Sequence, residues 1–533
     1  EMKKFVKEIL SPIDHQKGDT IPVSTFVDMA SGVFPAGSSA FEKRGIAVDV
    51  PEWDPTKCAQ CNRCAMVCPH AVIRPVALTA DELAAAPANT KAVDLKVPKD
   101  SGLKYALIIS TLDCTGCASC ANVCPTKSLT MKPIASQLDS QPVFDALCDI
   151  DPKAEVASDK TVVSAQYLKP YLEFSGACAG CGETPYAKLA TQLFGDKMYI
   201  ANATGCSSIW GGSAPSTPYT VDKHGNGPAW SNSLFEDNAE FGLGMFLAQA
   251  QIRSRLAEDA IALKETSVGK EVQEYLDTFH STRGNDAPAK ALISAIENTE
   301  FEGDAKDAAE DFLKDKDYAA KKSQWIFGGD GWAYDIGFGG LDHVLAQNQD
   351  VNVLVFDTEV YSNTGGQASK STPTGAVAQF AASGKITKKK DLAKIAMSYG
   401  YIYVAQVAMG ADYNQCLKAM KEAEAYNGPS LVICYAPCIN HGIKMPFNQA
   451  EQKKAVEAGY WNLFRFNPAL VEESKNPFSL DSKAPTSDYI EFINGETRYS
   501  ALRRSFPEKA DKLFNIAAEN AVQKYNDLVR TVE

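Results

Sequence analysis

Residues 323–366 read SQWIFGGDGWAYDIGFGGLDHVLAQNQDVNVLVFDTEVYSNTGG. The segment contains two apolar runs, 323–327 and 351–357, separated by residues 335–347, whose apolar positions have helical spacing. Strand, helix and strand in this order predict two parallel strands joined by a crossover helix. A glycine-rich loop follows the first run and a polar loop follows the second. Both loops are therefore expected at the same edge of a parallel sheet.

The same alternation continues on both sides of this segment. Apolar runs at 198–203, 401–407 and 431–435 predict further strands, and residues 413–426 predict a helix between the last two. The sequence therefore predicts an α/β domain with an open, mostly parallel sheet. The long charged segment 250–322 is expected to be a solvated helical insertion without chemistry of its own.

Oxygen donors lie in the loops that follow the two strands of the opening segment. Asp330 lies within Gly329-Asp330-Gly331, and Thr358 and Val360 follow the second strand. Mg²⁺ prefers an octahedral set of oxygens that commonly includes phosphate oxygens. We expect the Asp330 carboxylate, the Thr358 hydroxyl and the Val360 carbonyl to hold Mg²⁺ beside a diphosphate at a helix N-terminus. The pattern resembles the thiamine diphosphate motif with threonine at its usual asparagine, although a Gly-Asp-Gly alone can be a plain turn.

Two cysteine runs share one spacing, C-x2-C-x2-C-x3-C-P. The runs are Cys58, Cys61, Cys64 and Cys68, and Cys114, Cys117, Cys120 and Cys124. This spacing is typical of bacterial two-cluster ferredoxins, in which the fourth cysteine of each run binds the other cluster. One cluster is therefore predicted on Cys58, Cys61, Cys64 and Cys124, and the other on Cys114, Cys117, Cys120 and Cys68. A pair of zinc ribbons is the alternative, but zinc does not require three evenly spaced cysteines before a fourth.

A third set of cysteines begins with the pair Cys178 and Cys181 in a glycine-rich stretch. A cluster there needs two more ligands, and Cys206 and Cys438 each follow a predicted strand, where open α/β sheets place their sites. A zinc site or an unrelated C-x2-C pair stays open as an alternative. The remaining cysteines are predicted to be free thiols: Cys148, Cys416 and Cys434.

The composition excludes several classes of protein. The 533 residues carry 53 Lys and Arg against 66 Asp and Glu, a net charge of −13, which disfavours nucleic acid as a partner. No apolar run approaches the length of about 18 residues that predicts a membrane span. Lysines interrupt the apolar positions at the start, unlike a signal peptide. Without a membrane span or a signal peptide, the chain is expected to be cytoplasmic and to bind neither membrane nor nucleic acid. Tightly spaced cysteines in such a chain indicate metal ligands rather than disulfides.

Together these motifs resemble one family, the 2-oxoacid:ferredoxin oxidoreductases, and within it the pyruvate:ferredoxin (flavodoxin) oxidoreductase branch. The resemblance rests on a thiamine site, a third cysteine set and a two-cluster ferredoxin in one chain. It also includes residues 41–47 and 233–242, outside the motifs, and it covers nearly all of residues 20–450. The combination is much more specific than any of the motifs alone.

The resemblance implies the cofactors thiamine diphosphate, Mg²⁺ and three [4Fe-4S] clusters. It implies that Cys178, Cys181, Cys206 and Cys438 hold the cluster nearest thiamine. It further implies that thiamine diphosphate is contacted by Glu183, Cys206, Gly329, Asp330, Gly331, Trp332, Thr358, Glu359, Val360, Tyr361, Ser362 and Asn363. No catalytic residue is assigned to this chain, because the glutamate that activates the cofactor belongs to the amino-terminal half of the family's single-chain members.

The predicted organisation follows the motifs along the chain. We expect a lead-in at 1–50, a two-cluster ferredoxin-like α+β domain at 51–135, a connector at 136–170, the thiamine diphosphate and third-cluster domain at 171–450, and a carboxy-terminal extension at 451–533. Between the two cysteine runs, an alanine-rich stretch at 80–88 predicts a short helix.

The activity that the resemblance implies belongs to anaerobic metabolism. It is the oxidative decarboxylation of pyruvate with coenzyme A to acetyl-CoA and CO₂, with electrons passed singly to ferredoxin or flavodoxin. Alternatives are a related enzyme acting on 2-oxoglutarate or indolepyruvate, and a non-catalytic iron–sulfur electron-transfer protein. Because the chain begins with Glu1 and family members are much longer, we expect it to be the carboxy-terminal half of a larger polypeptide, which the family suggests is a homodimer.

Overall fold

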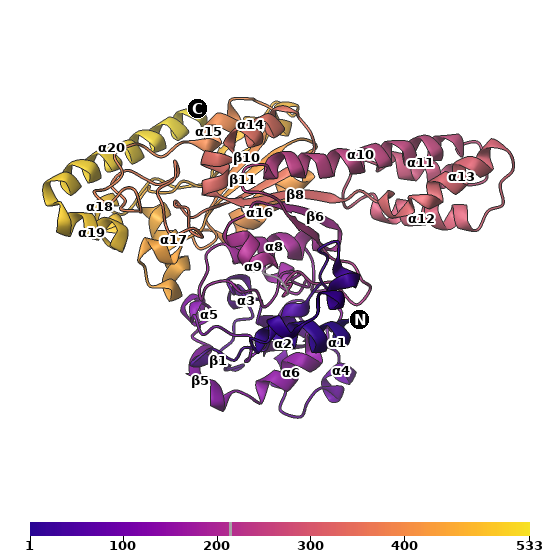
Figure 1. The fold of residues 1–533 in the computed structure, drawn as a ribbon, viewed down its shortest axis with the longest axis horizontal. Coiled ribbons are helices and arrows are strands. Elements are labelled where there is room, and N and C mark those ends of the chain that lie inside the picture. The colour runs from indigo at the N-terminus through magenta and orange to yellow at the C-terminus, as the bar shows by residue number, and fades with distance from the viewer. Residues whose placement is uncertain (213–215, 533) are drawn as a thin grey trace.

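The computed structural model describes residues 1–212 and 216–532. A large α/β domain lies above a smaller domain formed by the first part of the chain, and a group of helices projects from the side of the α/β domain (Figure 1). None of the helices in the described ranges is both long and apolar enough to cross a membrane.

The α/β domain is built on a sheet that has eight strands within the described residues. The strand order is β13-β12-β10-β11-β9-β8-β6-β7. The strands are β6 (Met198–Asn202), β7 (Ala229–Asn232), β8 (Ser323–Gly329), β9 (Asn352–Asp357), β10 (Tyr403–Val407), β11 (Ser430–Tyr435), β12 (Phe464–Phe466) and β13 (Phe478–Leu480). Pairing is parallel from β7 to β10, whereas β12 and β13 are antiparallel. The predicted open, mostly parallel sheet is confirmed.

The central strand β9 explains why its sequence is an uninterrupted apolar run. Every residue of β9 is buried. Val353 and Val355 belong to the apolar core on one face of the sheet, and Leu354 and Phe356 belong to the core on the other. Because successive side chains of a strand point to opposite faces, a strand covered on both faces must be apolar at every position.

The helices between the strands go beyond the two that were predicted at 335–347 and 413–426. They include α8 (Thr184–Phe194), α9 (Cys206–Gly212), α14 (Phe338–Ala346), α15 (Leu392–Met397) and α16 (Tyr413–Ala425). The helix predicted at 335–347 begins later as an α-helix, because Gly331–Ile336 form a π-helical turn. This turn holds the buried Trp332 indole against Gly328 and Gly337, where an added Cβ would lie 2.3 Å from the ring.

The predicted helical insertion is a layered group of helices with a core of its own. It comprises α10 (Asn238–Ala262), α11 (Gly269–Asp277), α12 (Asp286–Glu297) and α13 (Asp304–Lys314). Leu256, Tyr275 and Phe312 are among the fully buried residues of this core. The first helix starts twelve residues before the predicted boundary at 250, since Gly242 of α10 packs directly on Ile326 of β8. The later part of α10, together with α11, α12 and α13, forms the arm that projects from the α/β domain (Figure 1).

In the ferredoxin-like domain, the first strand pairs with the last. Strand β1 (Asp49–Trp53) pairs with β5 (Leu129–Pro133), and β4 (Lys104–Ile109) pairs with β2 (Ile73–Leu78) and β3 (Val93–Asp94), all antiparallel. Two short helices, α3 (Arg63–Met66) and α5 (Ser119–Val123), carry the third cysteine of each run. The predicted helix at 80–88 is present as α4 (Ala80–Ala85). The predicted α+β character is confirmed.

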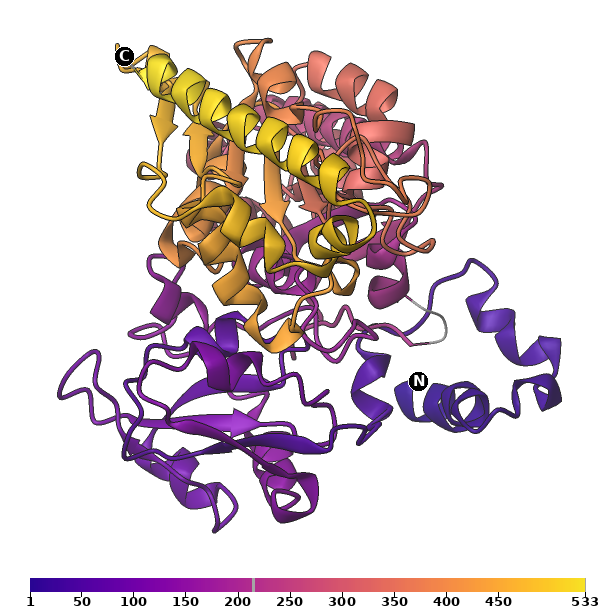
Figure 2. The same ribbon diagram turned by 90° about the vertical axis from the view of Figure 1, so that its left-hand side faces the viewer.

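The segments around these two domains also pack against them. In the connector, α6 (Ser140–Leu147) and α7 (Val162–Ala165) add Phe144 to the core of the ferredoxin-like domain and Ala165 to the core of the α/β domain. The lead-in starts with α1 (Met2–Phe5) and α2 (Ser11–Asp14) and lies beside the ferredoxin-like domain (Figure 2).

The part of the chain from residue 451 adds strands β12 and β13 to the sheet. Its helices include most of α17 (Asn448–Glu457), then α18 (Tyr489–Asn494), α19 (Thr497–Ser505) and α20 (Pro507–Val532). The long α20 runs across the sheet strands in Figure 2. Phe514 and Leu528 of α20 are buried in the core on that face.

Candidate cofactor site

A cavity of about 100 Å³ lies at the carboxyl edge of the sheet, where β6, β8 and β9 end. Most residues predicted to contact thiamine diphosphate line it: Glu183, Cys206, Gly329, Asp330, Gly331, Trp332, Val360, Tyr361, Ser362 and Asn363. The cavity is also lined by residues that sequence reasoning missed: Thr204, Gly205, Ser207, Phe235 and Thr364. Gly205, Ser207 and Thr364 are adjacent in sequence to predicted residues, and Thr204 is two positions from Cys206, so only their proximity could have indicated them.

The three oxygens predicted to hold Mg²⁺ come together beside this cavity. The Thr358 hydroxyl lies 2.9 Å from Oδ1 of Asp330 and 3.1 Å from the Val360 carbonyl oxygen. The Thr358 backbone N–H donates a second hydrogen bond to the same Asp330 oxygen, at 3.1 Å. All three residues are buried. The parallel pairing of β8 with β9 explains this convergence, because it places both following loops at one edge.

The surroundings of Asp330 favour a bound cation. Ser369 donates a hydrogen bond of 2.7 Å to Oδ2 of Asp330, so its local partners are neutral groups. Burial and the nearby carboxylate of Asp357 raise the pKa of Asp330 well above its usual range. Within the described ranges, no lysine or arginine forms an ion pair with Asp330. A divalent cation would supply the missing positive charge, so the residues fit Mg²⁺.

Glu359 is a predicted contact that the structure does not bring to the cavity. Its carboxylate lies 2.8 Å from Nζ of Lys389 and 2.7 Å from the Arg498 guanidinium. Burial by itself would raise the pKa of Glu359, but Lys389 and Arg498 lower it to about 2. Lys389 also lies 2.8 Å from Asp357. Glu359 is therefore part of a buried ion network and is not among the residues that line the cavity.

Glu183 presents a carboxyl group to the cavity from the N-terminus of α8. The indole N–H of Trp210 donates a hydrogen bond of 2.7 Å to its Oε2. Burial raises the pKa of Glu183 to about 7, although the Trp210 hydrogen bond opposes this shift. The group can therefore carry a proton near neutral pH, and its Oε1 is the atom left to hold it.

Two residues without a motif support the loop after β9. Nε2 of the buried His441 lies 2.8 Å from the Thr358 carbonyl oxygen, and burial lowers the pKa of His441 to about 3. A neutral imidazole donates this hydrogen bond and fixes the loop. Ser369, which binds Asp330, comes from the segment between β9 and α15. Spacing alone does not predict these contacts, because 83 positions separate His441 from Thr358 and 39 separate Ser369 from Asp330.

The two ferredoxin-type cysteine runs lie close together in the structure. After burial, the charges of Cys61, Cys58 and Cys124 are the groups that raise the pKa of Cys64, so the fourth cysteine of the second run lies with the first three of the first run. The complementary set lines one cavity: Cys68, Cys114, Cys117 and Cys120. Four thiols around one cavity are the donor set that a [4Fe-4S] cluster requires.

The third cysteine set adjoins the cofactor cavity. Burial, Glu183 and the charges of Cys181 and Cys438 raise the pKa of Cys206, and Cys178 contributes to that of Cys438. Cys206 also lines the cofactor cavity, and its Sγ lies 3.1 Å from the Ser362 hydroxyl.

The cysteines predicted to be free thiols lie apart from these sets. Cys416 and Cys434 are fully buried in an apolar core, and Cys148 is half-buried beside the ferredoxin-like domain. In the part of the chain that the structure describes, no three His, Cys, Asp or Glu side chains are arranged to hold a single metal ion.

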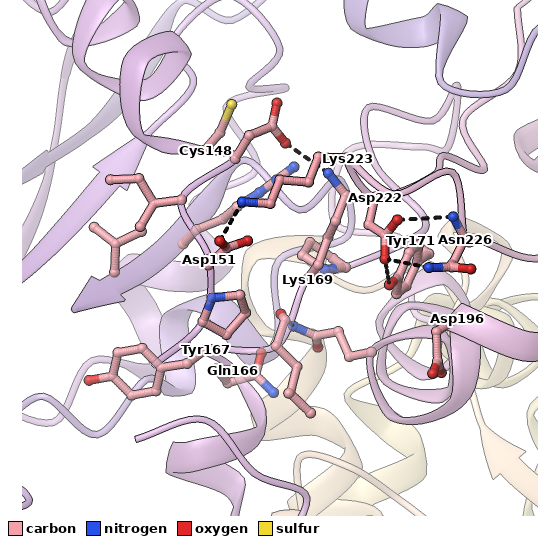
Figure 3. Close-up of a pocket in the computed structure, with 18 of the residues that line it drawn as sticks. Cys148, Asp151, Gln166, Tyr167, Lys169, Tyr171, Asp196, Asp222, Lys223 and Asn226 are labelled. Atoms are coloured by element: carbon pink, nitrogen blue, oxygen red, sulfur yellow. Dashed lines mark hydrogen bonds and ion pairs between the residues drawn. The ribbon is translucent and has the colours of Figure 1, made fainter. Parts of the chain in front are cut away.

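A larger cavity, about 770 Å³, lies between the connector and the α/β domain (Figure 3). Several of its charged side chains form ion pairs across it: Lys223 binds Asp151, and Lys169 lies 2.8 Å from Asp149. The Tyr171 hydroxyl lies 3.4 Å from Asp222. None of the predicted cofactor residues lines this cavity, so volume alone does not identify the site.

Comparison with known families finds profiles that match four parts of the chain. Residues 308–434 match the profile of the C-terminal TPP-binding domain of thiamine pyrophosphate enzymes. Residues 50–73 and 107–130 match profiles of the 4Fe-4S binding domain. Residues 1–47 match EKR, a domain of unknown function. The predicted thiamine-binding domain and two iron–sulfur modules are confirmed.

Curated relatives are similar to the chain over its whole length. It is 53% identical to the pyruvate:ferredoxin oxidoreductase of Moorella thermoacetica, covering 100% of this chain and 46% of that protein. It is 52% identical to the pyruvate-flavodoxin oxidoreductase of Klebsiella pneumoniae, covering 98% and 45%. It is 45% identical to the mitochondrial pyruvate dehydrogenase [NADP(+)] of Euglena gracilis, covering 99% and 30%. The predicted resemblance is confirmed, and the chain spans less than half the length of these relatives.

Proposed function

We propose that this chain, which resembles pyruvate:ferredoxin and pyruvate-flavodoxin oxidoreductases from end to end, is the part of such an enzyme that holds thiamine diphosphate, Mg²⁺ and three [4Fe-4S] clusters. The complete enzyme would convert pyruvate and coenzyme A to acetyl-CoA and CO₂ and pass electrons singly to ferredoxin or flavodoxin. One observation carries this proposal: Cys206 lines the cofactor cavity and also belongs to the third cysteine set. Carbon chemistry and electron transfer would therefore meet at one residue.

The loops after β8 and β9 would bind and orient the cofactor. Asp330, Thr358 and Val360 would hold Mg²⁺ against the diphosphate through the oxygens described above. Gly331 allows close packing at the cavity, because an added Cβ there would lie 2.6 Å from the Tyr361 ring. Thiamine diphosphate, when bound there, would supply a carbanion for the decarboxylation and a sink for the electrons that it leaves. Glu183 would hold a proton at Oε1 toward the cavity.

The cysteine sets would carry the electrons away from the cavity. Cys178, Cys181, Cys206 and Cys438 would hold the first cluster. Gly180, between Cys178 and Cys181, donates a backbone hydrogen bond to Cys117 of the ferredoxin-like domain, which supports contact between the third set and the next cluster. Since each cubane takes up one electron at a time, adjacent clusters suit a one-electron acceptor.

The remaining polypeptide would complete the site. The cavity of about 100 Å³ is smaller than the roughly 300–1,000 Å³ of most small-molecule sites, so these residues would form only part of the complete site. We infer that the remaining polypeptide supplies the substrate and coenzyme A contacts, that the enzyme works in the cytoplasm, and that it forms a homodimer. The relatives' greater length supports the first of these inferences.

Substrate comparison tests the proposal. In the complete protein, CO₂ release and acceptor reduction would be measured with pyruvate, 2-oxoglutarate and indolepyruvate, with and without coenzyme A. We expect the highest rate with pyruvate, dependence on coenzyme A, and loss of activity in Asp330→Asn but not in Asp196→Asn. A higher rate with another acid would favour the related enzyme. Clusters without Mg²⁺-dependent thiamine diphosphate binding would favour an electron-transfer protein. The 533-residue chain alone should release no CO₂.

A further inference from the structure

Lys188 is a buried lysine at the contact between the α/β domain and the ferredoxin-like domain. Its side chain is only 2% exposed. From α8, its Nζ donates hydrogen bonds to the carbonyl oxygens of Ala65 and Met66, at 2.9 Å for Met66. These two residues lie between Cys64 and Cys68. The α/β domain thus inserts a cation among the cysteines of its neighbour.

The ammonium of Lys188 has no carboxylate partner. Within residues 1–212 and 216–532, no Asp or Glu forms an ion pair with it, whereas the other buried lysine Lys197 binds Asp286. Burial lowers the pKa of Lys188 to about 8, and the favourable charges opposing this shift come from Cys68 and Cys64. An ammonium removed from water requires a compensating negative charge. Among the described residues, the negative charges that act on Lys188 most strongly are those of Cys68 and Cys64, whose thiolates the predicted clusters would bind.

We propose that Lys188 acts as the counter-charge of both clusters of the ferredoxin-like domain and raises their reduction potentials. This inference rests on the proposed cluster assignment, which places Cys64 and Cys68 in different clusters. A cubane held by four thiolates is negatively charged, and one-electron reduction adds another negative charge. A fixed ammonium in a low-dielectric interior therefore stabilises the reduced form more than the oxidised form.

Lys188 would favour reduction of the cluster that contains Cys68 more strongly. The charge of Cys68 affects the pKa of Lys188 more than the charge of Cys64 does. The Ala65 carbonyl also accepts the backbone N–H of Cys68, at 3.3 Å, so Lys188 and Cys68 share one acceptor. A helix-capping role for Lys188 alone would stabilise α3 without changing the affinity of either cluster for an electron.

Potentiometric titration monitored by electron paramagnetic resonance tests this inference in the complete, cluster-loaded protein. In Lys188→Met, which keeps the length of the side chain, we expect the equilibrium constant for reduction of the Cys68 cluster to fall about tenfold. For a one-electron couple that corresponds to about 59 mV. The Cys64 cluster should shift in the same direction by less. The third cluster should be unchanged, because its cysteines do not contribute to the environment of Lys188.

Two matched variants separate charge from structure. Lys188→Arg keeps the charge and should leave both equilibrium constants within twofold of the wild type. Lys197→Met removes a buried lysine that binds Asp286 in the same domain, and it should leave every cluster potential unchanged.

Three outcomes would overturn the inference. The first is unchanged potentials in Lys188→Met with full iron content. The second is loss of both clusters in Lys188→Met but not in Lys188→Arg, which would assign Lys188 to assembly. The third is absence of two ferredoxin-type signals from the wild type, which would overturn the cluster assignment itself.

Discussion

The hydroxyl of Thr358 lies 2.9 Å from Oδ1 of Asp330, although 28 positions separate the two residues. The register of the parallel pair β8 and β9, in which Gly329 lies opposite Phe356, creates this relationship. Threonine stands where the thiamine diphosphate motif usually has asparagine, yet its hydroxyl reaches the oxygen set. The backbone register thus keeps a side-chain oxygen next to Asp330 even though threonine replaces the usual asparagine.

Thr358→Val should weaken Mg²⁺ binding. Valine keeps the shape of threonine but removes the oxygen that lies between Asp330 and the Val360 carbonyl. We expect about a tenfold or larger loss of Mg²⁺ affinity, in line with losses at metal-site neighbours. Mg²⁺-dependent retention of thiamine diphosphate in equilibrium binding measures it. Thr387→Val, at an exposed position, is the control. Equal Mg²⁺ affinity in wild type and Thr358→Val would remove Thr358 from the ligand set.

Cys438→Ala should remove one cluster. The proposal gives about twelve irons per chain, from three four-iron cubanes. The variant should hold about eight irons and lose the signal of the cluster nearest thiamine, because Cys438 belongs to the third set. Cys416→Ala, a buried thiol outside every set, should keep the wild-type iron content. An unchanged iron content in Cys438→Ala would contradict the third cluster.

Paired cysteine variants should reveal the exchange between the two runs. Cys68 lines one cavity with Cys114 from the other run, whereas Cys124 lies with Cys64. Cys68→Ala with Cys114→Ala should therefore cost one cluster, while Cys68→Ala with Cys64→Ala should cost two. Iron analysis and Mössbauer spectroscopy measure the difference. The reverse result, with two clusters lost in the first pair, would mean that each run binds its own cluster.

Glu359→Gln should destabilise the protein without removing a contact to the cofactor. The substitution leaves Lys389 and Arg498 without one of their buried partners. Removing one member of a buried ion pair typically costs about 3–5 kcal/mol. Denaturant unfolding at neutral pH measures the loss. Glu457→Gln, in an exposed pair with Lys453, should cost at most about 1 kcal/mol. Equal losses in the two variants would contradict a structural role for the buried network.

Lys385 should make stability depend on pH in the alkaline range. Its Nζ donates to the carbonyl oxygens of Ser369 and Thr372, both at 2.6 Å, and burial followed by the charge of Lys389 lowers its pKa from 10.5 to about 8. Between these values the unfolded chain binds more protons than the folded one, so this contribution to stability rises with pH.

Denaturant unfolding at several pH values measures this contribution. The stability of the wild type relative to Lys385→Met should increase as the pH is raised above about 8. The exposed Lys512→Met variant should show no comparable trend relative to the wild type. If the difference in free energy of unfolding between the wild type and Lys385→Met stays constant or falls as the pH rises, the lowered pKa of Lys385 is contradicted.

Local spacing was sufficient to predict the main elements of the fold. The strand positions followed from apolar runs, as in β9, and the repeated cysteine spacing predicts the exchange of Cys68 and Cys124 between the two clusters. The start of α14 could not be predicted, because the π-helical turn before it depends on the packing of Trp332 between Gly328 and Gly337.

The amino-acid sequence by itself determined the parallel sheet, the cysteine sets and the loops that bear Asp330 and Thr358, because periodicity and ligand spacing are properties of short segments. Tertiary structure alone decided that Glu359 faces Lys389 rather than the cavity, and that Lys188 lies among cysteines of another domain. These arrangements join residues that are far apart in sequence. They arise from the packing of whole elements and from the need of buried charges for partners.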